Sequence, residues 1–255
     1  MKKYFIFPGV LIAAVAIFFS CKKEYTIVAT GHISSGVAYL KIVHASPNFT
    51  KLFGVPDGIN VFVGSTKVNG PVLKFNSAYP AIGSLTGYAE VQPGDQAIKI
   101  SVGGVVTGDS IAVDTLHKTL TAGSYYTLLI TDSLKSATDA GKVWMQDNLP
   151  SPSAGNISLR FVNMVLNSPD TVNLYSKRRG QVLFSGVMRD SVTAFANFPT
   201  LTNVLDSFYV QKQGVNQSTL LMTSLMFDQK VYTLYFIGDT ANKAKTRVLT
   251  YVQNK

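Results

Sequence analysis

The feature that most constrains the fold of this chain is a β-strand pattern that occurs twice. The segment Ile157–Asn163 matches Ala38–His44 in residue type and in order. Farther along each half, Val231–Asp239 matches Tyr125–Asp132 in the same way. Because similar pieces recur in the same order, the sequence predicts an internal duplication of one domain.

Short apolar segments separated by turn signals predict an all-β structure. The segments are rich in β-branched and aromatic residues, and clusters of Gly, Pro, Asn or Asp end them every 8 to 15 residues. No stretch holds a helical period over 11 positions, so the pattern favours an antiparallel β-sandwich in each half. The strands expected in the first half are Val37–Ala45, Ile59–Val63, Val72–Phe75, Ala97–Val102, Ser110–Asp114, Lys118–Leu120, Tyr125–Thr131 and Lys142–Gln146.

The segment Leu149–Gly155 is the best candidate for a linker between the halves. It holds two prolines together with Ser and Gly, and no large apolar residue after Leu149. The predicted organisation is a signal peptide at 1–20, a lipidated tether at 21–36, a first β-sandwich at 37–148, the linker at 149–155 and a second β-sandwich at 156–255.

The N-terminal stretch predicts export. Lys2 and Lys3 precede a nearly continuous apolar run at 4–19, which is shorter than the roughly 20 residues of a membrane-spanning helix. Cys21 follows at once, and with Phe18 and Ser20 it resembles the lipobox of bacterial lipoproteins. The resemblance implies cleavage after Ser20, diacylglycerol on the Cys21 thiol and anchoring to the outer membrane, on its periplasmic or surface face. The alternative is an uncleaved anchor helix with a chance cysteine at its end.

Composition narrows the function classes. Cys21 is the only cysteine, so both domains must fold on their apolar cores, which a hydrophobic content of 46% allows. The segment 24–150 has a net charge of −1 and the segment 151–255 a net charge of +6, with a basic run at Lys177-Arg178-Arg179. That run precedes Gly180 and is typical of a solvated hairpin turn, the alternative being a binding patch. Nucleic acid is not an expected partner of an exported lipoprotein.

Three segments of the first half carry a family resemblance. Leu40–Pro47, Asp57–Gly64 and Leu120–Thr127 resemble the domain of unknown function numbered 4397. The resemblance implies an immunoglobulin-like or related β-sandwich in exported bacterial proteins of the Bacteroidetes type, often lipid-anchored and often in tandem. The family has no established activity. The second half departs from the pattern, because Asn163-Met164-Val165 replaces His44-Ala45-Ser46, and we expect it to be a diverged copy.

His44 is the titratable residue of the family-like motif. It is interpreted as a structural residue that ends a strand and bonds the backbone near Ser46, the alternative being a ligand or a general base. No metal-binding motif, nucleophile elbow or phosphate-binding loop is present, so we expect no catalytic residue, no metal and no cofactor.

Six Asp-Ser or Asp-Thr pairs that are followed by a small or aliphatic residue resemble the O-glycosylation site of Bacteroidetes-type exported proteins. Aspartate that caps a turn before a strand gives the same pattern, so both interpretations stay open. The candidate acceptors are Ser110, Thr115, Ser133, Thr171, Ser191 and Thr240.

Two function classes fit this sequence. The first is a non-catalytic, lipid-anchored structural or interaction module with a partner protein in the envelope. The second is a glycan-binding surface lipoprotein that uses Tyr79, Tyr88 or Trp144 for stacking, although Trp144 is more typical of a core residue.

Overall fold

The computed structural model describes residues 36–54, 56–81, 87–103, 112–132, 142–167, 171–212 and 218–255. The predicted signal peptide, Cys21 and the tether up to residue 35 lie outside these ranges, as do Ser110 and Ser133. Residues 34–255 belong to one compact unit. No helix of the described ranges is long and apolar enough to cross a membrane.

The described residues form two halves that correspond strand by strand, as the repeat predicted. The first half holds β1 (Ala38–His44), β2 (Ile59–Val63), β3 (Thr66–Lys67), β4 (Ser77–Tyr79), β5 (Ala89–Val91), β6 (Gly94–Val102), β7 (Ala112–Leu120), β8 (Tyr125–Ile130) and β9 (Lys142–Gln146). The second half holds β10 (Asn156–Leu166), β11 (Val172–Ser176), β12 (Gln181–Val187), β13 (Ser191–Val192), β14 (Ala196–Pro199), β15 (Asp206–Lys212), β16 (Ser218–Ser224), β17 (Val231–Asp239) and β18 (Val248–Gln253).

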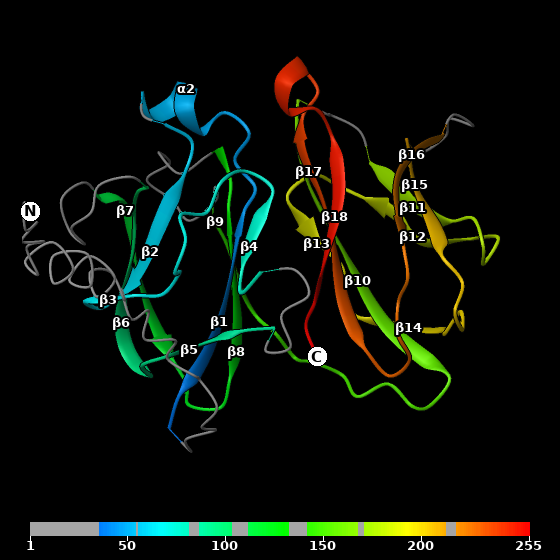
Figure 1. Cartoon of the computed structure of the whole chain (residues 1–255), viewed down its shortest axis with the longest axis horizontal. Coiled ribbons are helices and arrows are strands. Elements are labelled where there is room, and N and C mark those ends of the chain that lie inside the picture. Colours follow the sequence, from blue (N-terminus) through cyan, green and yellow to red (C-terminus); the bar gives the residue numbers. More distant parts are fainter. Residues whose placement is uncertain are drawn as a thin grey trace, which may run out of the picture. The chain divides into compact units, whose positions relative to one another are not determined.

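Each half is a sandwich of two sheets with the same connectivity. One sheet has the order β4-β1-β8-β9 in the first half and β13-β10-β17-β18 in the second, and β5 and β14 add to β1 and β10. The other sheet has the order β3-β2-β6-β7 or β12-β11-β15-β16. Figure 1 shows β1, β8 and β9 side by side in one half and β10, β17 and β18 in the other. The predicted β-sandwich fold is confirmed in both halves.

Among the described strands, one pair in each half is parallel and the other pairs are antiparallel. β1 pairs with β8, and β10 pairs with β17, in parallel register. These four strands are buried on both faces, which explains why their sequences are almost continuous apolar runs rather than alternating ones. Alternate residues of these strands pack into different apolar clusters. Leu40 and Ile42 belong to the core of the first half, whereas Val43 belongs to a separate cluster.

A third apolar cluster joins the two halves. Val43, Ala45 and Leu129 come from β1 and β8 and the residue after β1, while Val162, Met164, Tyr235 and Ile237 come from β10 and β17. All seven side chains are at most 2% exposed. Val162 lies at the position of Val43, and Tyr235 at that of Leu129, so equivalent surfaces of the two halves contact each other.

Some elements differ from the predicted ones. Residues 72–75 form only an isolated bridge from Leu73 to Ile59, because the buried Asn69 amide bonds the Val61 N–H and the Ile59 and Pro71 carbonyls in place of a strand ladder. The two short strands expected near Ser110–Asp114 and Lys118–Leu120 are one strand, β7. A five-residue helix, α2 (Phe49–Phe53), was not predicted, and it buries Phe49.

Candidate functional site

Two groups of polar side chains lie where the halves meet. We call the first the junction charge cluster, which consists of Lys41, Tyr88, Asp147, Arg160 and Asn254. We call the second the histidine cluster, which consists of His44, Ser46, Asp57, Asp132 and Lys245. Among the described residues, no three His, Cys, Asp or Glu side chains gather in a way that would hold a metal ion.

The junction charge cluster contains two buried cations that reach across to the opposite half. Lys41 of β1 is 0% exposed, and its Nζ donates to Asn254 Oδ1 at 3.0 Å and to the Gln253 carbonyl at 3.3 Å. Arg160 of β10 is 4% exposed, and its Nη1 lies 2.5 Å from Asp147 Oδ1. Each cation therefore connects the first strand of its own half to the end of the other half.

The two cations occupy equivalent positions. Lys41 lies opposite Thr127 in β8, and Arg160 lies opposite Thr233 in β17. Each also stacks on an aromatic ring of its own half, with Lys41 Nζ 4.3 Å from the Tyr88 centroid and Arg160 Cζ 4.6 Å from the Phe195 centroid.

The acceptors of these cations are equivalent as well. Asp147 follows β9 and Asn254 follows β18, and each bonds a threonine of the neighbouring strand. The Thr127 hydroxyl donates to Asp147 at 2.5 Å, whereas the Asn254 amide donates to Thr233 at 3.0 Å. Tyr88 OH also donates to Asp147 at 2.8 Å. The cluster thus holds two cations and one carboxylate.

Burial dominates the acid–base properties of this cluster. It lowers the pKa of Lys41 to about 7, although the nearby Asp147 carboxylate acts in the opposite direction, and Arg160 lowers the value further. Burial also raises the pKa of Tyr88, and Asp147 raises it further. Burial raises the pKa of Tyr235, which lies beside Arg160, to about 12. Both phenols therefore stay neutral and serve as packing and hydrogen-bonding groups.

We expect the Lys41 ammonium to make stability depend on pH. Its pKa is about 7 in the folded protein and about 10.5 when unfolded, so between these values the unfolded chain binds one proton more. The free energy of unfolding should therefore rise with pH across this window, by at most about 1.4 kcal/mol per pH unit from this group. Urea titrations at pH 7, 8 and 9 measure the slope.

Two variants test whether Lys41 causes this pH dependence. Lys41→Met should remove the contribution of Lys41 to the slope of unfolding free energy against pH. Asn254→Asp would place a second carboxylate beside Lys41 Nζ, which should raise the lysine pKa and flatten the slope. A wild-type slope equal to that of Lys41→Met would show that Lys41 is fully charged in the folded protein at neutral pH.

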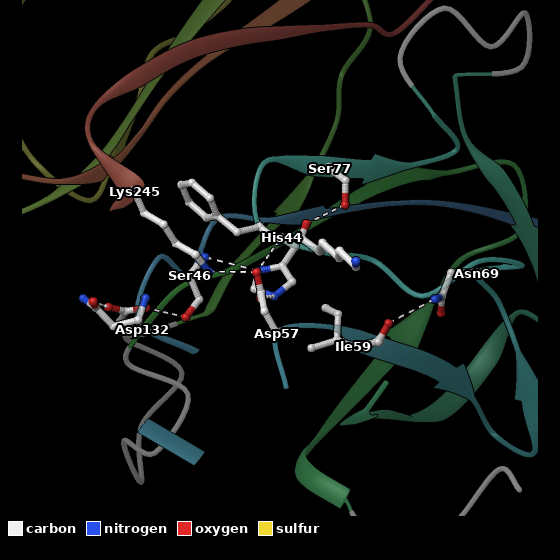
Figure 2. Close-up of polar contacts among 11 residues, drawn as sticks. His44, Ser46, Asp57, Ile59, Asn69, Ser77, Asp132 and Lys245 are labelled. Carbon is white, nitrogen blue, oxygen red and sulfur yellow. Dashed lines mark hydrogen bonds and ion pairs between the residues drawn. The ribbon is translucent and has the colours of Figure 1, made fainter. Parts of the chain in front are cut away.

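The histidine cluster lies where β1 ends (Figure 2). The His44 ring is 0% exposed, and its Nδ1 accepts a hydrogen bond from the Ser46 backbone N–H at 3.3 Å. Its Nε2 lies 3.4 Å from Asp57 Oδ1, and Lys245 Nζ of the second half lies 2.7 Å from Asp57 Oδ2. The predicted bond between His44 and the nearby backbone is confirmed, while its pairing with Asp57 was not foreseen.

The electrostatics fit a neutral imidazole beside an ionised carboxylate. Burial lowers the pKa of His44, although the Asp57 carboxylate acts against that shift. Burial alone would raise the pKa of Asp57, but the hydrogen bonds from His44 and Lys245 hold it well below its usual range. With Nδ1 accepting an N–H, the neutral ring carries its proton on Nε2, toward Asp57.

This arrangement does not form a nucleophile–base pair. The Ser46 hydroxyl donates to Asp132 Oδ1 rather than to His44, and it is the Ser46 backbone N–H that donates to the ring. Both ring nitrogens face protein groups and the ring is closed to solvent, so no nitrogen is free to take a proton from a substrate.

The second half supports a structural role for the ring. Asn163 occupies the position of His44, and its Oδ1 faces the Val165 backbone N–H at 3.4 Å, two residues ahead as in the first half. At both strand ends, a side chain accepts a hydrogen bond from the backbone N–H two residues later. The side-chain amide of Asn163 accepts this bond as the imidazole of His44 does.

We expect His44→Asn to lower the free energy of unfolding by about 1–2 kcal/mol. The contact with Asp57 is lost, while the asparagine side chain can still accept the hydrogen bond from the Ser46 N–H. His44→Ala should cost more, about 2–4 kcal/mol, since it leaves a cavity beside Phe49 and the Ser46 N–H without its acceptor. Thermal or urea unfolding measures both. Unchanged stability in His44→Asn would contradict the structural role.

Asn48 ties the same end of the two halves together. Its Nδ2 donates to Asp132 Oδ2 at 2.6 Å and to Asp239 Oδ2 at 2.8 Å, while its Oδ1 accepts from Asn242 Nδ2 at 3.0 Å. Asp132 lies two residues after β8, and Asp239 is the last residue of β17. No sequence motif indicates this contact, because its residues lie nearly 200 positions apart.

The structure describes four of the six candidate glycan acceptors. Thr115 lies exposed in β7, Ser191 is half-buried in β13, and Thr171 directly precedes β11. Thr240 is exposed, and its hydroxyl donates to the Asn167 carbonyl at 2.8 Å. Asp239 accepts the Ala241 N–H, which is the turn-capping geometry. O-glycosylation at these four positions, and at Ser110 and Ser133, stays a prediction.

The aromatic residues proposed for stacking do not form a platform. Tyr88 is 5% exposed and lies beneath Lys41. Trp144 stacks on Tyr126 at 5.3 Å, and both Trp144 and Tyr79 pack against the core of the first half. The core interpretation of Trp144 is confirmed.

Sequence reasoning missed the junction charge cluster, although a signal was present. Leu40-Lys41-Ile42 and Leu159-Arg160-Phe161 place a single cation inside an apolar strand. In a strand buried on both faces, such a cation must be buried and paired. Lys41 and Arg160 occupy matching positions of the repeat, so both halves carry this signal.

Comparisons with known proteins place the chain in a family. A family model described as Domain of unknown function (DUF4397) matches residues 38–175, more than half of the 255 residues. This chain belongs to the DUF4397 family. The matched part of the DUF4397 protein covers the first half, the linker segment Leu149–Gly155 and the first two strands of the second half. None of the curated proteins has a matching sequence.

Solved structures give distant matches to the DUF4397 protein. A candidate cell adhesion protein from Bacteroides uniformis is 11% identical, with 86% of this chain and 100% of that chain covered and a TM-score of 0.23. A candidate cell adhesion protein from Bacteroides ovatus is 10% identical (87% and 97% covered, TM-score 0.20). A fimbrial assembly protein from Parabacteroides distasonis is 7% identical (85% and 99% covered, TM-score 0.20). Likenesses at these TM-scores do not establish a shared function.

Proposed function

We propose that this DUF4397 protein is a non-catalytic, lipid-anchored protein of the outer membrane that acts as a structural or protein-interaction module. The observation that carries the proposal is the use made of its buried ionisable groups. Lys41 contacts Asn254 and Arg160 contacts Asp147 across the two halves. At the other end Lys245 contacts Asp57 across the halves, and Asp57 also contacts His44. Groups that hold two halves together are not free for acid–base chemistry.

The proposed role follows from how the halves are joined. An apolar cluster and two polar clusters fix the second half against the first, so the loops of both halves are presented on one body. Cys21 would attach this body to the membrane through lipid, as the lipobox-like segment predicts. We also propose that the second half is a diverged copy of the family domain, which the matching strand order supports.

Crosslinking of intact cells that express the lipidated protein tests the interaction role. We expect an envelope protein to be crosslinked reproducibly and to be lost when the exposed loops of the second half are exchanged. Purified protein that turns over a substrate at a rate sensitive to His44→Asn would contradict the non-catalytic assignment.

A second candidate function, glycan binding, is favoured by one observation. A cleft of about 600 Å³ opens beside the junction charge cluster. Its lining includes Tyr125, which stacks on Tyr39 at 4.6 Å, together with the exposed polar residues Gln146 and Asn148. An aromatic ring among amide groups suits a sugar. Polysaccharide binding that is lost in Tyr125→Ala with unchanged stability would establish this function, and its absence would remove it.

A further inference from the structure

We propose that one end of the second half is a membrane-contact face for anionic lipid headgroups. We call it the entry face, and it consists of Lys177, Arg178, Val204, Leu205 and Phe227. The proposal rests on the proposed lipid anchor, and it identifies the surface of the anchored protein that contacts the bilayer.

Three loops of the second half converge to form the entry face. The Arg178 backbone N–H donates to Asp206 at 3.2 Å, which places the turn between β11 and β12 beside the segment that leads into β15. Asp206 also pairs with Ser224 at the end of β16, and the loop that carries Phe227 follows directly. The Thr200 hydroxyl donates to Asp228 at 2.6 Å, which ties that loop to the segment before Val204.

The exposed side chains of the entry face combine apolar and basic character. Phe227 is 59% and Leu205 56% exposed, and Val204 is exposed next to Leu205. Lys177 and Arg178 are exposed beside them, whereas Arg179 is paired with Asp206. Large apolar side chains flanked by cations are the composition that binds the interface of an anionic membrane.

The entry face lies at the end of the described fold where the chain enters β1 from Gly36. Gly36 leads into β1, whose first residues lie beside Val91 and Tyr125. At this same end the two halves are joined by Lys41 with Asn254 and by Arg160 with Asp147. In the second half, β10 and β17 begin here, and Phe227 lies in the turn before β17.

The chain length between anchor and fold limits the distance from the bilayer. About 15 residues separate Cys21 from Gly36. A chain of that length reaches at most about 50 Å, whatever its conformation. A lipid on Cys21 therefore keeps this end of the protein near the bilayer surface, where Phe227 and Leu205 can reach the interface.

The single tryptophan of the protein allows a direct test. In a Trp144→Phe background, Phe227→Trp places the only tryptophan on the entry face, and Met188→Trp places it at the opposite end of the second half. Met188 is a matched control, because it is 63% exposed and follows β12 at the end far from Gly36. The lipidated proteins are reconstituted into brominated phosphatidylcholine vesicles with and without phosphatidylglycerol.

We expect several-fold stronger quenching at position 227 than at position 188, and stronger quenching with phosphatidylglycerol. Lys177→Glu with Arg178→Glu should abolish the phosphatidylglycerol effect. Lys243→Glu with Arg247→Glu, which reverses two exposed cations at the opposite end, should leave it unchanged. Equal quenching at the two positions, or none at 227, would overturn the proposal. Shielding of position 227 only by an added envelope protein would assign the face to that protein instead.

Failure of the anchor and failure of the membrane-contact face give different results. Mass spectrometry of Cys21 reports on the anchor, and tryptophan quenching reports on the face. An acylated protein without quenching at position 227 would overturn the face alone. If Cys21 carries no lipid, the same protein is added to preformed vesicles, where quenching at position 227 supports the face and its absence overturns it.

Discussion

Replacing Asp147 with asparagine is expected to lower the free energy of unfolding by about 3–5 kcal/mol. Asp147 is 4% exposed and provides the carboxylate between two buried cations, with Arg160 Nη1 at 2.5 Å. The asparagine keeps the size of the side chain but removes its charge, so the Arg160 guanidinium is left buried without a counter-charge. Urea unfolding at pH 7 measures the loss.

The loss in Asp147→Asn should also depend on pH. Without the carboxylate, the pKa of Lys41 should fall below about 7, so the neutral amine should dominate already at neutral pH. The matched control is Asp95→Asn, in which an exposed aspartate bonds a threonine hydroxyl at 2.6 Å. That change should cost less than about 1 kcal/mol. Equal losses in the two variants would show that the buried charge of Asp147 does not support the fold.

Replacing Cys21 with alanine is expected to abolish lipidation completely. The thiol is the predicted acceptor of diacylglycerol, and no other cysteine exists to replace it. Two or three acyl chains give stable anchoring, whereas a protein without them has no comparable hold on the bilayer. Labelled fatty acid should be incorporated into the wild-type protein and not into the variant.

A conservative variant controls for general effects on export. Ser20→Ala keeps a small residue before Cys21 and should be labelled like the wild type. Label that is still incorporated in Cys21→Ala would contradict the lipobox interpretation. A variant that stays in the membrane fraction without label would instead favour the uncleaved anchor helix.

Most strands were predictable because a strand buried in a sandwich needs apolar, β-branched or aromatic residues, and turn residues end it. The predicted strands Ile59–Val63 and Lys142–Gln146 have the bounds that the structure shows for β2 and β9. The failed strand at Val72–Phe75 illustrates the limit. Its residues suit a strand, but Asn69, several positions earlier, takes the hydrogen bonds that would have formed the ladder.

The contacts between the halves could not be predicted from local sequence patterns, because they join residues far apart in the chain. Lys41 contacts Asn254 across more than 200 positions, and Asp57 contacts Lys245 across nearly as many. Neither pair has a fixed spacing that a motif could capture. The sequence indicated that His44 bonds its own turn, because that bond is local, but the partner of its second nitrogen depends on the packing of two distant segments.

The equivalent surfaces that join the halves make this chain the single-polypeptide counterpart of a twofold-symmetric dimer. In a symmetric dimer of one half, any change at a contact would occur twice, so Lys41 and Arg160, or Asp147 and Asn254, would have to be identical. Joining the copies in one chain removes that constraint. One carboxylate can then become an amide while its counterpart stays charged, so each side of the contact is free to evolve separately.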